Sequence, residues 1–167
     1  MTVQTVAIVG AGTMGNGIAH VFALHGYETT LIDLDESLLD EARGTIEQNL
    51  TRQVEKDAIA PADRADALDR LSFTPDTASG VAVADLVVEA VPEERSLKAE
   101  VFGTLDEHAP DEAILASNTS SISITWIGSQ TDRPDRVVGM HFFNPVPVMT
   151  LVEAVRGQRT SDATYGV

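Results

Sequence analysis

Apolar residues in this chain alternate between short continuous runs and stripes at helical spacing. The run Thr5–Val9 ends in a glycine, which is typical of a strand buried on both faces. Apolar residues then recur at helical spacing over 14–25, and a further glycine follows where a helix commonly ends. Residues 29–32 predict a second strand, which Asp33 closes.

The same pattern continues to the end of the chain. It predicts helices over 36–56, 61–71, 96–108 and 123–128, and strands over 71–74, 84–91, 113–116, 137–140 and 150–155. Strands that alternate with helices indicate a parallel sheet covered on both faces. We therefore expect an α/β, doubly wound, mostly parallel sheet with a helical excursion after the second strand. Residues 1–155 form the expected domain, and the polar stretch 156–167 is interpreted as the start of a linker.

Composition narrows the classes of partner. The 167 residues include 26 acidic and 11 basic ones, for a formal net charge of −15, and no cysteine. Binding to phosphate-rich surfaces needs surplus Lys and Arg, so we expect neither nucleic acid nor membrane as a partner. No metal site is expected, and the missing cysteines exclude a thiolate one. The N-terminus lacks a basic region before an apolar core, so the predicted location is cytoplasmic.

The basic residues are themselves skewed, with nine Arg and only two Lys, Lys56 and Lys98. A solvated acidic surface that keeps the protein soluble is one interpretation. Adaptation to molar salt is the other, since screening then shortens to about 3 Å and self-repulsion is tolerable. The low Lys content favours the halophilic interpretation.

The sequence GAGTMG carries the first candidate chemistry, and it fits the pattern G-x-G-x-x-G. Its members are Gly10, Gly12, Thr13, Met14 and Gly15. The motif follows a predicted strand and opens a predicted helix, and the acid Asp33 closes the next strand. This context indicates a dinucleotide site, in which helix N–H groups hold the pyrophosphate and the acid binds the ribose hydroxyls. An acid there favours NAD over NADP. The alternative is a simple glycine turn.

Four histidines are candidates for a general base. His20 and His25 lie on the first predicted helix, and His108 lies near the end of another, where packing or solvation explains them. His141 instead follows the predicted strand 137–140, and ligands of parallel α/β sheets bind at the carboxyl ends of strands.

Four strings support a more specific interpretation: VAIVGAGTMGNGIAHVFALHGY, DLVVEAVPE, ASNTSS and GMHFFNPVPVMTLVE. With these strings the chain resembles the NAD-binding domain of 3-hydroxyacyl-CoA dehydrogenases, including 3-hydroxybutyryl-CoA dehydrogenases. The resemblance runs from about residue 3 to residue 155 and implies a Rossmann-like fold with NAD as cofactor. It also implies the interconversion of (S)-3-hydroxyacyl-CoA and 3-oxoacyl-CoA, in β-oxidation or short-chain acyl metabolism.

The resemblance also implies residue roles. His141 resembles the catalytic base, and Glu153 resembles the carboxylate that orients it. Ser117 resembles the hydroxyl that contacts the substrate oxygen and the cofactor, and Asn144 the amide that holds nicotinamide or the reacting oxygen. From the residues alone, Ser117 could cap a turn and Asn144 could form one with the following proline. Glu153 lies on an apolar strand, where a carboxylate is expected to be buried and partnered by a histidine.

Further roles implied by the resemblance concern both ligands. Glu93 and Lys98 match positions near NAD, although a helix-start acid and a surface lysine are the plain alternatives. Coenzyme A contacts are implied for Ser117 and for the predicted helix 36–56, where Asn49, Arg52 and Lys56 share one face.

Members of the family continue into an all-helical domain that forms the dimer and closes over the acyl chain. Nothing in this sequence matches that domain. Two alternatives to an enzyme complete in itself therefore stay open. The chain is an NAD-binding module that acts with a separate helical partner or as a homo-oligomer, or it is an inactive truncated remnant. The residues that a loss of the helical domain is expected to expose are Phe142, Phe143, Val146 and Met149.

Overall fold

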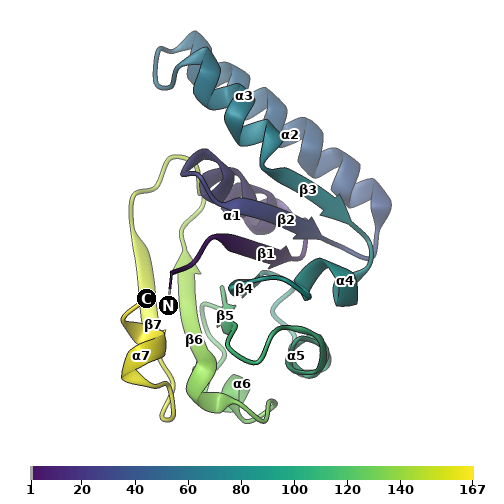
Figure 1. Ribbon diagram of the computed structural model, residues 1–167, viewed down its shortest axis with the longest axis vertical. Coiled ribbons are helices and arrows are strands. Elements are labelled where there is room, and N and C mark those ends of the chain that lie inside the picture. The colour runs from purple at the N-terminus through teal and green to yellow at the C-terminus, as the bar shows by residue number, and fades with distance from the viewer. Residues whose placement is uncertain (1) are drawn as a thin grey trace.

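The computed structural model describes residues 2–167, and a single sheet organises them. Its strands are β1 (Thr5–Val9), β2 (Glu28–Ile32), β3 (Leu71–Thr74), β4 (Leu86–Glu89), β5 (Ile114–Ser117), β6 (Val137–Phe142) and β7 (Val152–Arg156). Within the described residues the sheet is seven-stranded, in the order β3-β2-β1-β4-β5-β6-β7. All neighbours are parallel except β6 and β7, which are antiparallel (Figure 1). This confirms the expected mostly parallel, doubly wound sheet.

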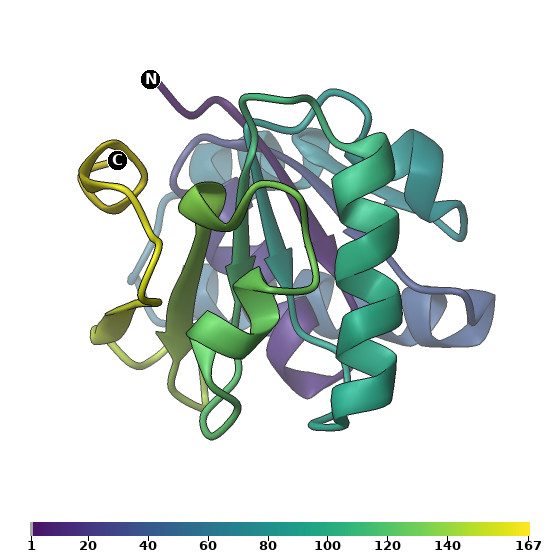
Figure 2. The ribbon, with the colours of Figure 1, turned by 90° about the horizontal axis from the view of Figure 1, so that it is seen from below.

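Helices cover both faces of this sheet (Figure 2). On one face lie α1 (Thr13–Leu24), α2 (Glu36–Glu55) and α3 (Pro61–Asp69), and on the other lie α4 (Thr77–Val81), α5 (Arg95–His108) and α6 (Ile124–Gly128). The alternation along β1 explains the two layers, because successive strand side chains point to opposite faces. Val6 and Ile8 pack with the first group of helices, and Ala7 and Val9 pack with the second. The continuous apolar run is therefore a strand buried on both faces.

The helical excursion after β2 consists of α2 and α3, which lie side by side at the β3 edge of the sheet (Figure 1). Asp35 caps α2 by accepting a hydrogen bond from the Ser37 backbone N–H at 2.9 Å. Only one face of α2 is buried, at Leu39, Ala42, Ile46 and Leu50. The opposite face is polar and exposed, as the sequence pattern predicts.

The structure differs from the predicted elements around β6. This strand does not end at residue 140 but continues to Phe142, so His141 lies within it. Pairing with β7 extends it, because His141 lies opposite Glu153 in the antiparallel ladder. The last strand is Val152–Arg156 rather than 150–155. The local pattern predicts both strands but does not show that they pair, and the pairing sets where β6 ends.

Two short helices were not predicted. Asp76 caps α4, and Ser161 caps α7 (Asp162–Tyr165). Both are too short to show a helical stripe. The segment interpreted as a linker is packed against β6, since the Thr160 hydroxyl donates to the Val137 carbonyl at 2.6 Å. A short 3-10 turn, η1 (Pro134–Arg136), precedes β6. None of the helices within residues 2–167 is long and apolar enough to cross a membrane.

Candidate active site

The loop between β1 and α1 is shaped by close backbone approaches. Gly10 has φ +105°, and a Cβ there would lie 2.8 Å from the Ala90 carbonyl oxygen. A Cβ on Gly15 would lie 1.7 Å from the Gly10 carbonyl oxygen, so only glycine fits. Above Gly12 the space is open, because a Cβ there would meet nothing within 4 Å. The free N–H groups at the start of α1 can therefore receive an anion, and no acid stands in the first turn of the helix.

Asp33 closes β2 beside this loop, as the sequence predicts. Its Oδ2 accepts a hydrogen bond from the Ala11 backbone N–H at 2.8 Å, and its Oδ1 accepts one from the Asp35 N–H at 3.0 Å. The carboxylate thus fixes the glycine loop and borders a cavity of about 900 Å³, here called the outer cavity. This cavity runs from Asp33 past Thr13 and Met14 to Val91. Its volume and its position between the glycine loop and Asp33 fit a dinucleotide.

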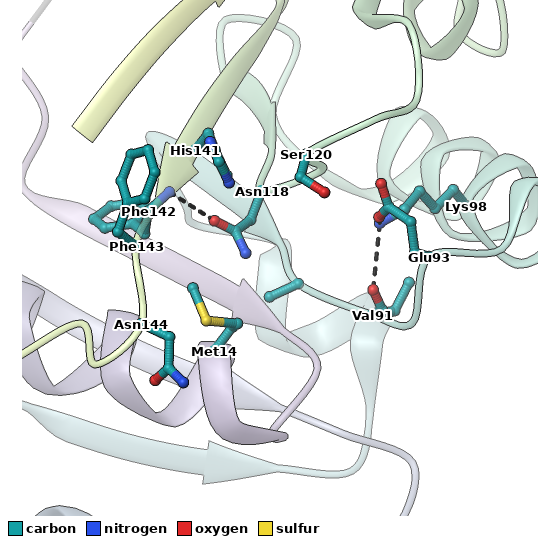
Figure 3. A pocket seen from close by; sticks show the side chains of 11 residues that line it. Met14, Val91, Glu93, Lys98, Asn118, Ser120, His141, Phe142, Phe143 and Asn144 are labelled. Atoms are coloured by element: carbon teal, nitrogen blue, oxygen red, sulfur yellow. Dashed lines mark hydrogen bonds and ion pairs between the residues drawn. The ribbon is translucent and has the colours of Figure 1, made fainter. Parts of the chain in front are cut away.

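A second cavity of about 360 Å³, the inner cavity, continues from the outer one, because Met14, Ala90 and Val91 line both. The other residues of its wall are Glu93, Lys98, Asn118, Ser120, His141, Phe142, Phe143 and Asn144 (Figure 3). They come from the loops after β4, β5 and β6, from β6 itself and, for Lys98, from α5. The carboxyl ends of neighbouring parallel strands therefore meet here, as in other open α/β sheets.

His141 and Glu153 form a hydrogen-bonded pair at this cavity. Nδ1 of His141 lies 2.8 Å from Oε2 of Glu153, and the two residues are direct neighbours in the β6–β7 ladder. The ring of Phe143 packs against the imidazole, with the two centroids 4.6 Å apart. The expectation of a buried Glu153 is wrong, since its side chain is 53% exposed. The reason is that β7 is the edge strand and all its residues are exposed.

Ser117 is buried and does not lie on the wall of the inner cavity. It is the last residue of β5, is fully buried, and donates its hydroxyl to Glu89 Oε2 at 2.6 Å. It does not line the inner cavity, whereas Ser120, three residues later, does. Both serines belong to the same string, ASNTSS. Ser117 is buried because it is the last residue of β5, whereas Ser120 lies in the loop that follows and reaches the cavity wall.

Sequence reasoning missed Glu89 and Asn118. Glu89 is a fully buried carboxylate at the end of β4, and an acid that closes a continuous apolar run was the available signal. Asn118 accepts a hydrogen bond on its Oδ1 from the Phe142 backbone N–H at 2.8 Å. Its Nδ2 is therefore the group left to serve the cavity, as a donor.

Glu93 and Lys98 both reach the inner cavity wall, and their functional groups lie side by side (Figure 3). Nζ of Lys98 lies 3.4 Å from Oε2 of Glu93, and Lys98 is only 1% exposed, so it is no surface lysine. Burial acts to raise the pKa of Glu93. Hydrogen bonds from Thr119 and Ser121 and the charge of Lys98 outweigh burial and lower this pKa to about 2.

The residues expected to contact coenzyme A follow one face of α2. Asn49 lines a cavity of about 460 Å³ together with Gly12, Asn144 and Pro145. Arg52 and Lys56 are exposed one and two turns further along, and Arg52 donates to Gln48 Oε1 at 3.0 Å. The structure thus brings Asn49 and Asn144 together, and leaves Arg52 and Lys56 outside this cavity.

The other histidines lie away from both cavities. His20 is buried and its Nε2 pairs with Gln53 Oε1 at 3.0 Å. Nδ1 of His25 lies 2.7 Å from the Val21 carbonyl oxygen, at the end of α1. His108 is the last residue of α5. The described residues contain no cluster of three or more side chains suited to hold a metal ion.

A glycine loop at a helix start, an acid after the second strand and a histidine–carboxylate pair at the far end of the cavity define a dinucleotide-dependent dehydrogenase domain. Comparison with known proteins agrees. Residues 5–166 match the family model described as 3-hydroxyacyl-CoA dehydrogenase, NAD binding domain. The chain belongs to this family, and NAD is its cofactor.

Individual relatives cover nearly all of this chain. A 3-hydroxybutyryl-CoA dehydrogenase of Bradyrhizobium diazoefficiens is 44% identical over 163 residues, which are 98% of this chain and 55% of that protein. The mitochondrial hydroxyacyl-coenzyme A dehydrogenase of Rattus norvegicus is 43% identical, over 98% of this chain and 54% of the rat protein. The crystal structure of (S)-3-hydroxybutyryl-CoA dehydrogenase from Ralstonia eutropha superposes with a TM-score of 0.95 at 43% identity, over 99% of this chain and 58% of that one. The chain thus spans about half the length of these relatives.

Proposed function

We propose that this domain takes part in the NAD-dependent interconversion of (S)-3-hydroxyacyl-CoA and 3-oxoacyl-CoA, with short acyl chains as substrates. The observation that carries the proposal is the His141–Glu153 pair at the inner cavity, 2.8 Å between Nδ1 and Oε2. The relatives named 3-hydroxybutyryl-CoA dehydrogenase support a short acyl chain. A place in fatty-acid metabolism follows from this substrate class.

His141 acts as the general base in this proposal. Because a carboxylate oxygen only accepts, the hydrogen of the ring lies on Nδ1, and Nε2 keeps a lone pair. Nε2 takes the proton of the 3-hydroxyl group, and Glu153 stabilises the imidazolium that forms. NAD+, held by the glycine loop and Asp33, would supply the acceptor for the hydride of C3. In the reverse direction His141 returns the proton to the oxygen.

Two polar side chains on the cavity wall orient the reactants. Ser120 takes the substrate-oxygen contact that the sequence assigned to Ser117, because the Ser117 hydroxyl is occupied by Glu89. Asn144 lines both the inner cavity and the cavity beside α2, so its amide can hold nicotinamide or the reacting oxygen. Ser117 serves the site indirectly, through Glu89.

The polar face of α2 receives the coenzyme A moiety. Asn49 contacts the part nearest the cavity, while Arg52 and Lys56 meet the phosphates further along the helix. Their positive charges stand among many acids, since residues 35–76 include eleven acidic and five basic residues. High salt would screen the repulsion between this surface and a phosphate ligand.

An NADH-oxidation assay with acetoacetyl-CoA tests the proposal, in low salt and in molar KCl. We expect turnover that His141→Ala abolishes and His108→Ala leaves intact, since His108 lies outside both cavities. Glu153→Gln should lower kcat more than it raises KM, because it removes the imidazolium's counter-charge. Turnover that persists in His141→Ala would refute the assigned base.

A second candidate is a binding module that acts only with a helical partner. The exposed side chains Val148, Met149 and Leu151 favour it, at 73%, 44% and 55% exposed, because they lie in one loop beside the catalytic pair. Of the residues expected there, Phe142 and Val146 are instead buried in the core. NADH binding without turnover at any salt would support this candidate over the autonomous enzyme.

A further inference from the structure

Three ionisable side chains form a cluster at the inner end of the cofactor cavity: Glu89, Lys98 and Glu93, here called the Glu–Lys–Glu cluster. Nζ of Lys98 lies 2.6 Å from Oε1 of Glu89 and 3.4 Å from Oε2 of Glu93. Glu89 and Lys98 are buried, whereas the Glu93 side chain is 39% exposed. Lys98 therefore lies between the buried carboxylate of Glu89 and the carboxylate of Glu93 on the cavity wall.

The hydrogen bonds of Glu89 match those of a carboxylate. Its oxygens receive the Val91 backbone N–H at 2.8 Å, the Lys98 ammonium at 2.6 Å and the Ser117 hydroxyl at 2.6 Å. An ionised carboxyl group is an acceptor only, and all three partners are donors. Since a buried charge is costly unless it is paired, Glu89 and Lys98 neutralise each other.

Glu93 is then the remaining charge of the cluster. Its oxygens accept from Thr119 and from Ser121, and its pKa of about 2 keeps it ionised at neutral pH. The Glu–Lys–Glu cluster therefore has a net charge of −1. Glu93 and Lys98 lie on the wall of the inner cavity (Figure 3). Glu89 does not line this cavity and is fully buried.

This charge faces the end of the cofactor that changes charge in a redox reaction. With the ribose of the adenosine half at Asp33 and the pyrophosphate at the start of α1, the nicotinamide end reaches the inner cavity. The nicotinamide ring is a cation in NAD+ and neutral in NADH. A wall of net charge −1 therefore stabilises the oxidised form relative to the reduced one.

We propose that Glu89 neutralises Lys98 from beneath the cavity wall, which leaves Glu93 as the net charge and shifts the domain's preference from NADH toward NAD+. Glu89 is thus a specificity-determining residue that does not touch the cofactor. The charge of Glu89 determines whether the positive charge of Lys98 is available to offset the negative charge of Glu93 near the nicotinamide ring.

The test measures the Kd of NAD+ and the Kd of NADH for the purified chain, the former by calorimetry and the latter by fluorescence. Glu89→Gln retains the shape but removes one negative charge, so Lys98 now offsets Glu93. We expect the ratio Kd(NAD+)/Kd(NADH) to rise at least about threefold, from the loss of one unit of charge near the ring. A purely structural effect would weaken both forms alike and leave the ratio unchanged.

A double variant, Glu89→Gln with Lys98→Met, removes both members of the buried pair and keeps the net charge at −1. Its ratio Kd(NAD+)/Kd(NADH) should match that of the wild type. Because the double variant leaves no unpaired charge buried, it should also fold even where Glu89→Gln alone is destabilised. Glu94→Gln is the matched control, since this neighbouring acid does not line the cavity. A ratio unchanged in Glu89→Gln, or a ratio in the double variant that departs from the wild type, would overturn the proposal.

Discussion

At the scale of single residues, the glycine loop contains one glycine that the fold requires, Gly15, and one that mainly leaves room for the cofactor, Gly12. Gly15→Ala should lower NADH affinity by at least about tenfold and destabilise the fold by about 1–3 kcal/mol, because its Cβ would meet the Gly10 carbonyl at 1.7 Å. Fluorescence titration and urea unfolding measure the two effects. Binding and stability equal to those of the wild type would contradict the geometry of the loop.

Gly12→Ala is the companion variant. A methyl group there meets no protein atom within 4 Å, so stability should change little. It projects over the start of α1, where the pyrophosphate approaches, so NADH affinity should still fall. Gly103→Ala, at an open position inside α5, is the control. It should leave NADH affinity unchanged and raise stability by about 0.5–1 kcal/mol, because alanine favours the helix.

Glu93 gives stability a defined pH dependence. Its pKa is about 2 in the folded chain against an ordinary value of 4.5, so the contribution is complete above about pH 4.5 and is lost as pH falls toward 2. Wild type should exceed Glu93→Gln in urea stability at pH 7, and the difference should shrink steadily below pH 4.5. A constant difference down to pH 2.5 would contradict this assignment.

The sequence predicted some of these residues and not others for physical reasons. The dinucleotide motif could be read because the chemistry depends on backbone shape, which glycine spacing encodes directly. His141 and Glu153 were named from a family resemblance, but their contact depends on the register of two strands. Glu89 was missed because its role arises from Lys98 and Ser117, which reach it only through the folded sheet.

At the scale of elements, a buried histidine joins α1 to α2. His20 is 1% exposed, its Nε2 pairs with Gln53, and its Nδ1 has no hydrogen-bond partner among the described residues. Desolvation lowers the pKa of His20 below 6.5, with the charge of His25 acting in the same direction against the Gln53 hydrogen bond. Unfolding therefore takes up a proton below about pH 6.5, and stability falls as pH decreases through that value.

His20→Gln removes this titration and keeps a donor for Gln53. The variant should lose less stability than the wild type between pH 7 and pH 5, as chemical unfolding at each pH would report. Parallel losses in the two proteins would show that His20 does not titrate in this range.

Long elements with a clear period were predicted well. Of the short helices, the sequence predicted the one over 123–128, found as α6 at Ile124–Gly128, but not α4 or α7. The excursion was expected as helices over 36–56 and 61–71 and is found as α2 and α3, at Glu36–Glu55 and Pro61–Asp69. In contrast, α4 and α7 have five and four residues, fewer than a stripe needs. The extension of β6 through His141 depends on β7, which contacts it only in the folded state.

At the scale of the whole molecule, 26 acidic side chains against 11 basic ones create mutual repulsion that salt can screen. We expect the midpoint of thermal unfolding to be several degrees higher in 2 M KCl than in low salt. One kcal/mol of added stability raises this midpoint by roughly 4–8 °C in a smaller domain, and by less in one of this size. Sucrose is the control, because it stabilises folded proteins through exclusion from their surface but does not screen charge. A rise caused by screening should therefore appear in KCl and not in sucrose. A midpoint equal at both salt concentrations would contradict adaptation to salt.

The antiparallel contact between β6 and β7 has a genetic consequence. His141 and Glu153 are close in sequence as well as in space, so one short coding stretch carries both members of the proposed proton-transfer pair. Fusion of this domain to different coding segments would change the part that covers the acyl group and leave the pair intact. Under the proposed function, new substrate ranges could then evolve by shuffling, without rebuilding the acid–base chemistry.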